Sequence, residues 1–188
     1  QRSILGDKME ENRHKEWLDN TGGFAQIDLL LLNDALELGD LDAELILEST
    51  KIKINSELEE ERFRKFRHFA ISRLWVIGAY ELVRITYERL SRKRNEIDEE
   101  VMKKVKETLT LFGELRVPLV KLEKQGQFGK MFSGVPSKYE FDENKGVGWR
   151  IVSTYKKKID VEVFYRRDLG DYLLDMFKIL NKDIRAEK

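Results

Sequence analysis

The side chains with the strongest claim to chemistry lie in one stretch, residues 57–93. His68 comes first, because an imidazole titrates near neutrality and can act as a general acid or base. At 100° per residue, His68 falls on the same apolar side of a helix as Trp75 and Leu82. The alternative is therefore a histidine at the edge of the core with one satisfied hydrogen bond, and its apolar neighbours favour that interpretation.

A second polar group follows in the same stretch. It consists of Arg73, Tyr80, Glu81 and Arg84, which fall within about 100° of one another on a helix. Two guanidinium groups on one face suit an anion such as phosphate, which predicts a ligand site. Glu81 can instead pair with Arg84 three residues further on. We favour the internal ion pair and keep anion binding as the alternative.

Arg62 and His68 also form an R-x5-H pair. This spacing resembles the R-x(4–6)-H motif of the HEPN ribonucleases. The resemblance covers these two residues, and Phe63 stands where that family usually has a polar residue. It implies a helical, often dimeric protein whose arginine and histidine act on the RNA backbone without a metal, commonly across the dimer interface. On one straight helix the two side chains point about 120° apart.

Residues 57–93 are predicted to form one long helix that carries all of these groups. Its middle, from Phe69 to Ile85, is the densest apolar run of the chain. Ser56 and Glu59 match a capping box at its start. Acidic residues gather at the beginning and basic residues towards the end, and both complement the helix dipole.

The length of this helix raises a packing problem. A helix over 57–93 is about 55 Å long, whereas a compact chain of this size is about 40 Å across. Either the helix bends, with Gly78 as the candidate position, or its ends project. Projecting ends of opposite charge would match acid to base in two antiparallel copies. We expect a homodimer through this helix, and a bent helix wrapped by its own neighbours is the alternative.

The remaining elements are predicted from periodicity and from turn residues. After 125–137, a loop rich in glycine, the apolar period changes from 3.6 to 2. The predicted helices lie over 7–19, over 24–38 with Gly39 as its cap, over 41–50 and over 96–112. Gly113 and Pro118 then break or kink the chain, and Leu115, Leu119 and Leu122 suggest one more short helix. The predicted strands lie over 138–141, 146–154 and 159–165, and Asp168 caps a closing helix.

This order predicts an α+β fold that is mostly helical. A bundle built on the long helix is followed by a small antiparallel hairpin or sheet and a closing helix. At 188 residues one domain is expected. The helical part spans about 7–125, and the hairpin with its helix, about 138–181, packs on it, since a hairpin alone is marginally stable.

Composition narrows the classes of function. Lys plus Arg and Asp plus Glu are both 35, so net charge gives no general attraction to nucleic acid or membrane. Acids also interleave with most basic clusters, so nucleic acid is not expected as a partner. The sequence has no cysteine, which suits a reducing cytoplasm. With two histidines and no nucleotide-binding motif, neither a metal nor another cofactor is expected.

Three hypotheses of function remain. The leading one is a non-enzymatic helical module that oligomerises and binds or regulates another macromolecule, because the long helix is polarised in charge and catalytic motifs are absent. The second is a metal-independent ribonuclease of HEPN type that uses Arg62 and His68. The third is a protein that binds a small anion through Arg73 and Arg84, with Tyr80 and Glu81 beside them.

Overall fold

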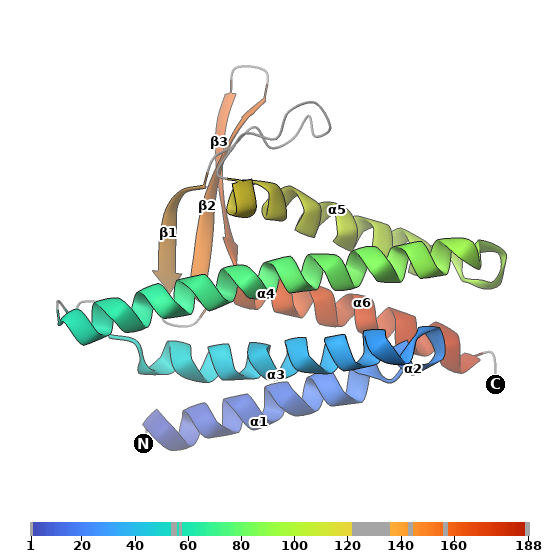
Figure 1. Ribbon diagram of the computed structural model, residues 1–188, viewed down its shortest axis with the longest axis horizontal. Coiled ribbons are helices and arrows are strands. Elements are labelled where there is room, and N and C mark those ends of the chain that lie inside the picture. The colour runs from blue at the N-terminus through green and yellow to red at the C-terminus, as the bar shows by residue number, and fades with distance from the viewer. Residues whose placement is uncertain are drawn as a thin grey trace.

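The computed structural model describes residues 2–53, 56, 58–121, 136–142, 145–155 and 158–186. It is mostly helical with one small antiparallel sheet and a closing helix, as the sequence predicts (Figure 1). The elements are α1 (Arg2–Thr21), α2 (Phe24–Ile27), α3 (Leu29–Lys51), α4 (Glu59–Arg92), the short 3₁₀ helix η1 (Arg94–Glu96), α5 (Glu99–Lys121), β1 (Pro136–Asp142), β2 (Gly146–Tyr155), β3 (Lys158–Tyr165) and α6 (Arg166–Ala186).

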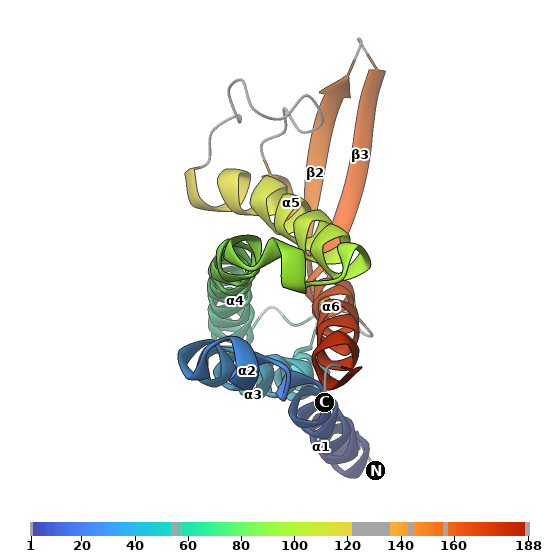
Figure 2. The ribbon, with the colours of Figure 1, turned by 90° about the vertical axis from the view of Figure 1, so that its right-hand side faces the viewer.

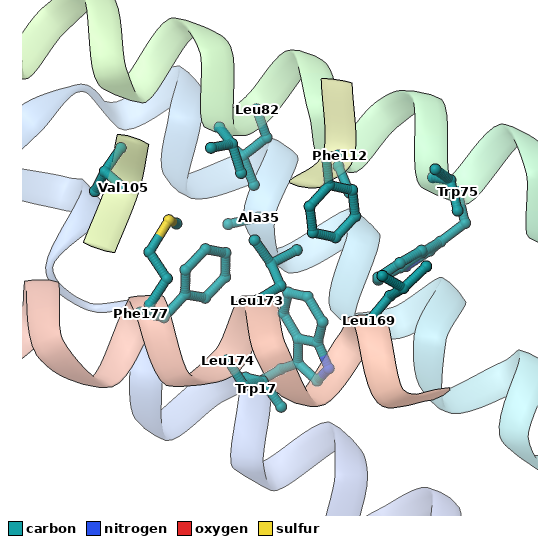
Figure 3. Packing of buried hydrophobic residues seen from close by; sticks show 14 of the residues in the cluster. Trp17, Ala35, Trp75, Leu82, Val105, Phe112, Leu169, Leu173, Leu174 and Phe177 are labelled. Carbon is teal, nitrogen blue, oxygen red and sulfur yellow. The ribbon is translucent and has the colours of Figure 1, made fainter. Parts of the chain in front are cut away.

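The core lies between α3, α4, α5 and α6, which surround it when the molecule is viewed end on (Figure 2). Helix α1 packs outside them, against α3 and α6. Large buried rings fill the centre, and Trp17 meets both Trp75 and Phe177 edge to face, with ring centroids 6.5 Å and 5.4 Å apart (Figure 3). Apolar burial by these four helices is the main force that holds the fold together.

The sheet has the strand order β1-β2-β3, and both pairings are antiparallel. The central strand β2 places Trp149 between Tyr139 of β1 and Phe164 of β3 in the register. Val147 and Trp149 are fully buried. Tyr165 ends β3 and Arg166 begins α6 directly, so the sheet is joined to the helical core without a linker on that side.

Helix α4 runs without interruption from Glu59 to Arg92, which corresponds to about 51 Å. Gly78 does not end or divide it. A Cβ at Gly78 would lie 3.1 Å from Cδ2 of Leu38, so this glycine allows α3 to approach closely. The first turns of α4 extend beyond β1 at the left of Figure 1.

The predicted helix end at Gly39 is wrong, and of the break or kink predicted at Gly113 and Pro118 the break does not occur. Gly39 does not cap a helix at residue 38, since α3 continues through it to Lys51 and includes the helix predicted over 41–50. A Cβ at Gly39 would lie 2.7 Å from the Trp17 ring. Gly113 and Pro118 lie within α5. Burial of Leu115 and Leu119 there outweighs the weak helix propensity of glycine and proline.

Two predicted caps are also wrong. Leu58 is the N-cap of α4 and makes no side-chain capping bond, while Ser56 Oγ accepts from the Leu58 N–H at 3.4 Å. Asp168 lies in the first turn of α6 and pairs with Lys145 at 2.8 Å. The loop predicted over 125–137 falls outside the described residues, except that β1 already begins at Pro136. Among the described residues, none of the helices has the length and apolar composition of a membrane span.

Candidate functional site

A buried ion cluster joins α1, α3 and α6. Asp42 of α3 is 0% exposed and accepts hydrogen bonds from Arg13 Nε of α1 and from Arg166 Nη1 of α6. The Trp17 indole donates to the same carboxylate at 2.9 Å. We define the ion cluster as Arg13, Asp42 and Arg166. Asp171 adds a second acceptor for Arg13, 2.6 Å from Nη1.

Electrostatics explain how these charges remain buried. Burial by itself would raise the pKa of Asp42, but Arg166 and Arg13 outweigh it and hold that pKa below its usual range. Gly170 makes room, because a Cβ there would lie 2.6 Å from Arg13 Nη2 and 3.0 Å from Asp42 Oδ1. The cluster is enclosed and its ion pairs join three helices, so its role is to fix α1, α3 and α6 relative to one another.

Sequence reasoning missed this cluster, although one signal was present. Asp42 is seven residues after Ala35 and three before Leu45, which places its carboxylate on the apolar face of α3. All three residues are buried. A charge on such a face requires a buried partner of opposite sign. The sequence could predict that a partner exists, but Arg13 and Arg166 became identifiable only from the tertiary structure.

His68 is placed at the junction of α4 with the sheet. It is 4% exposed, and its ring lies edge-on to Phe141 of β1 with centroids 6.0 Å apart. Burial, followed by the charge of Arg166, lowers the pKa of His68 to about 4. Nε2 is buried and has no hydrogen-bond partner within the described part of the chain. The imidazole is therefore neutral near pH 7 and almost completely buried.

Arg62, the other residue of the R-x5-H pair, is exposed on α4 while His68 is buried. One copy of the chain therefore does not bring the two side chains to a common surface. None of the contacts among the described residues favours the ribonuclease hypothesis, which stays a prediction from sequence.

The second sequence-predicted group lies further along α4. Arg84 donates to Glu81 at 2.7 Å and also to Glu88. Arg116 of α5 joins this group, with its guanidinium 4.7 Å from the centre of the Tyr80 ring and 3.7 Å from a Glu81 oxygen. Two carboxylates thus occupy Arg84, which leaves the group poorly suited to attract an anion.

Arg73 belongs to the same predicted group but is separate from these ion pairs. Within the described residues its Nε is buried without a hydrogen-bond partner. The ion pairs of Arg84 and Arg116 with Glu81 are present, and Arg73 has no part in them. Anion binding by the four residues stays a prediction from sequence.

The exposed face of α4 carries an apolar stripe. Phe63, Phe66 and Leu74 are 69%, 71% and 60% exposed, and the small Ala70 is exposed between them. At 100° per residue this α4 stripe, defined as Phe63, Phe66, Ala70 and Leu74, lies opposite the face that buries Trp75. Phe69, beside the stripe, stacks on the half-exposed Tyr139 of β1 at 4.8 Å, which extends the apolar surface towards the edge of the sheet.

A groove of about 370 Å³ runs between α3 and α4 next to the stripe. Phe63 forms part of its wall, Leu41 and Ile71 are among its apolar residues, and His68 also contributes to it. The cations Arg64 and Lys51 on its walls pair with Glu61 and Glu48. The groove is thus largely neutralised and adjoins the surface that Phe63 exposes.

No set of three or more His, Asp or Glu side chains among the described residues is arranged to hold a metal ion. No match was found when the chain was compared with protein-family models, with characterised proteins and with solved structures. The geometry of the α4 stripe and of the other surfaces therefore carries the functional argument.

Proposed function

We propose that this chain is a self-associating helical interaction module, and that a second copy covers the α4 stripe. One observation carries the proposal. Three large apolar side chains on a single helical face are each at least 60% exposed, although Trp75, Val76 and Ala79 on the opposite face of the same helix are fully buried. Apolar residues gathered in this way mark contact surfaces, whereas scattered ones do not. We also propose, as the sequence leads us to expect, that the protein is cytoplasmic and binds a protein partner.

The size of the stripe fits a reversible dimer. A phenylalanine side chain buries about 150 to 250 Å² when it is covered, so the rings of Phe63 and Phe66 offer a few hundred Å². Functional patches on monomers are about 300 to 600 Å². Stable interfaces begin near about 1,200 Å² in total. Two such patches, with their polar margin, would form an interface near that lower limit, so we expect association at micromolar concentration.

Charge along α4 indicates an antiparallel arrangement. Glu59 lies beside the stripe in the first turn of α4. Arg73 lies on the same side of the stripe, near its C-terminal end. In a two-fold pairing centred on Phe66, Glu59 of one copy meets Arg73 of the second copy. Opposite charges are therefore matched by one symmetry operation.

Light scattering after size exclusion tests this proposal. Wild-type protein at micromolar concentration is expected to have the mass of a dimer, and Leu74→Asp the mass of a monomer, because the variant buries an unpaired charge in the contact. Leu30→Asp is the matched control, since Leu30 is 70% exposed on α3, outside the stripe. A monomeric wild type, or equal dissociation by both variants, contradicts the proposal.

A charge exchange distinguishes a second copy from an unrelated partner. Arg73→Glu is expected to weaken the dimer, and adding Glu59→Arg is expected to restore it, because the two charges face each other only in a self-pairing. Failure of the double variant to recover, with both single variants folded, rules out this antiparallel register.

A further inference from the structure

A pocket lies at the opposite end of α4 from the stripe, where the chain turns through η1 into α5 (right side of Figure 1). Its volume is about 450 Å³, within the usual range for small-molecule sites. Seven residues from three consecutive elements line it, namely Tyr87, Ser91, Arg94, Glu99, Met102, Lys103 and Lys106.

Positive charge predominates in this pocket. Arg94, Lys103 and Lys106 contribute three cations, and Glu99 contributes one carboxylate. Among the described residues, none of the three cations forms an ion pair with a carboxylate. The pocket therefore holds an excess of two positive charges that the protein itself leaves uncompensated.

Neighbouring cations are engaged within the fold and show the contrast. Arg89 pairs with Asp28 at 2.9 Å. Lys104 lies between Lys103 and Lys106 in the sequence, and its ammonium group is 3.8 Å from the centre of the Tyr172 ring. Positive charge at this corner is thus used for packing in some positions and directed into the pocket in others.

The fold creates this concentration of charge from two separate sequence clusters. Arg94 comes from the basic run at the end of the long helix, and Lys103 with Lys106 comes from α5. In the sequence each cluster has adjacent acids, such as Glu96 and Glu107. The turn through η1 brings the cations to one pocket, which sequence spacing alone does not show.

We propose that this pocket binds a phosphate-bearing small molecule. The excess of two positive charges complements a phosphate dianion, and lysine and arginine are common phosphate-binding side chains. The hydroxyl groups of Tyr87 and Ser91 are further donors in the lining. Met102 and the Tyr87 ring provide apolar surface for an organic part of the ligand. This site is independent of the α4 stripe and of self-association.

Calorimetric titration with inorganic pyrophosphate, at ionic strength held constant with sodium chloride, tests the site on the full chain. Wild type is expected to bind pyrophosphate. The double variant Lys103→Gln/Lys106→Gln is expected to weaken binding by about tenfold or more, because it removes two charge-assisted contacts. The matched control is Lys8→Gln/Lys15→Gln, which removes the same net charge from exposed positions on α1 and is expected to bind like wild type.

The result is decided by the difference between the two double variants. No binding by folded wild type, or equal weakening in both doubles, overturns the proposal. The same three proteins are also titrated with a single-stranded oligonucleotide. Binding to the oligonucleotide that is tighter than binding to pyrophosphate, and lost only in Lys103→Gln/Lys106→Gln, would overturn the assignment to a small molecule in favour of a nucleic-acid backbone.

Discussion

The ion cluster and the α4 stripe invert the usual distribution of residues. Arg13, Asp42 and Arg166 carry charges yet are buried between three helices. Phe63 and Phe66 are aromatic yet exposed on the surface. The charges form ion pairs within one chain, with Asp171 as a further partner of Arg13, whereas the described residues provide nothing to cover the two rings. The cluster is therefore formed within one chain, and the stripe is the surface that we propose a second copy covers.

This comparison separates stability from association. Removing a member of the ion cluster should affect unfolding, because it strands a buried charge. Removing a member of the stripe should affect only the oligomeric state, because exposed side chains contribute little to the stability of the monomer. The following predictions test that separation, from the largest expected effect on unfolding to the smallest.

Asp42→Asn is expected to lower the free energy of unfolding by about 3 to 5 kcal/mol, because it takes from the buried Arg166 its ion-pair partner and from Arg13 one of its carboxylates. Urea denaturation followed by circular dichroism measures this change. The matched control is Asp40→Asn on the same helix, where Asp40 is exposed and pairs with the exposed His14. The control should change the free energy by no more than about 0.5 kcal/mol. If Asp42→Asn lowers the free energy of unfolding as little as Asp40→Asn does, the ion cluster does not fix the three helices.

His68 predicts a pH dependence with a definite sign. Its pKa is about 4 in the folded chain and 6.5 in the unfolded chain, so below pH 6.5 the unfolded state binds a proton that the folded state does not. This contribution is fully present above pH 6.5 and is lost as the pH falls towards 4. By pH 4 it amounts to a loss of about 3 kcal/mol.

The measurement is the free energy of unfolding of wild type and His68→Gln between pH 7 and pH 4. The decline in stability towards pH 4 should be shallower in His68→Gln than in wild type. NMR of the His68 imidazole in the His14→Gln background gives the folded pKa directly. A midpoint near 6.5 would contradict the buried, neutral histidine.

Phe66→Ala is expected to change the free energy of unfolding by no more than about 0.5 kcal/mol when measured at a dilution at which the chain is monomeric. Phe112→Ala makes the same substitution in the core, where Phe112 is fully buried. It should lower the free energy of unfolding by about 3 to 5 kcal/mol. A large loss in Phe66→Ala at high dilution would mean that the ring supports the monomer and that the stripe is not a free contact surface.

The sequence predicted elements better than it predicted their ends. The long helix was predictable because apolar periodicity and terminal charges agree, and its observed bounds are Glu59–Arg92. Gly39 and Gly113 gave false signals, because glycine marks a helix end locally but here admits the Trp17 ring and packs near Tyr80. Local sequence shows only that a residue is small, and the neighbour that needs the space is distant in the chain.

The candidate surfaces were only partly predictable. The pairing of Glu81 with Arg84 follows from their spacing on one helix and is present at 2.7 Å. Arg116 joins them from α5, and no local spacing predicts a contact between two helices. The exposed stripe was also missed, since Phe63 and Phe66 have the residue type of a core and only the positions of α3, α5 and the sheet show which face of α4 they leave uncovered.

The sequence by itself determined the α+β class, the existence of the long helix and the location of the small sheet, because periodicity, turn residues and helix-end charges act over a few residues. Only the tertiary structure decided which side chains meet. It joined Arg13, Asp42 and Arg166 across three helices, buried His68 against β1 and gathered Arg94, Lys103 and Lys106 around one pocket. Burial and electrostatic interaction depend on distances in space, and those distances arise from packing between elements far apart in the chain.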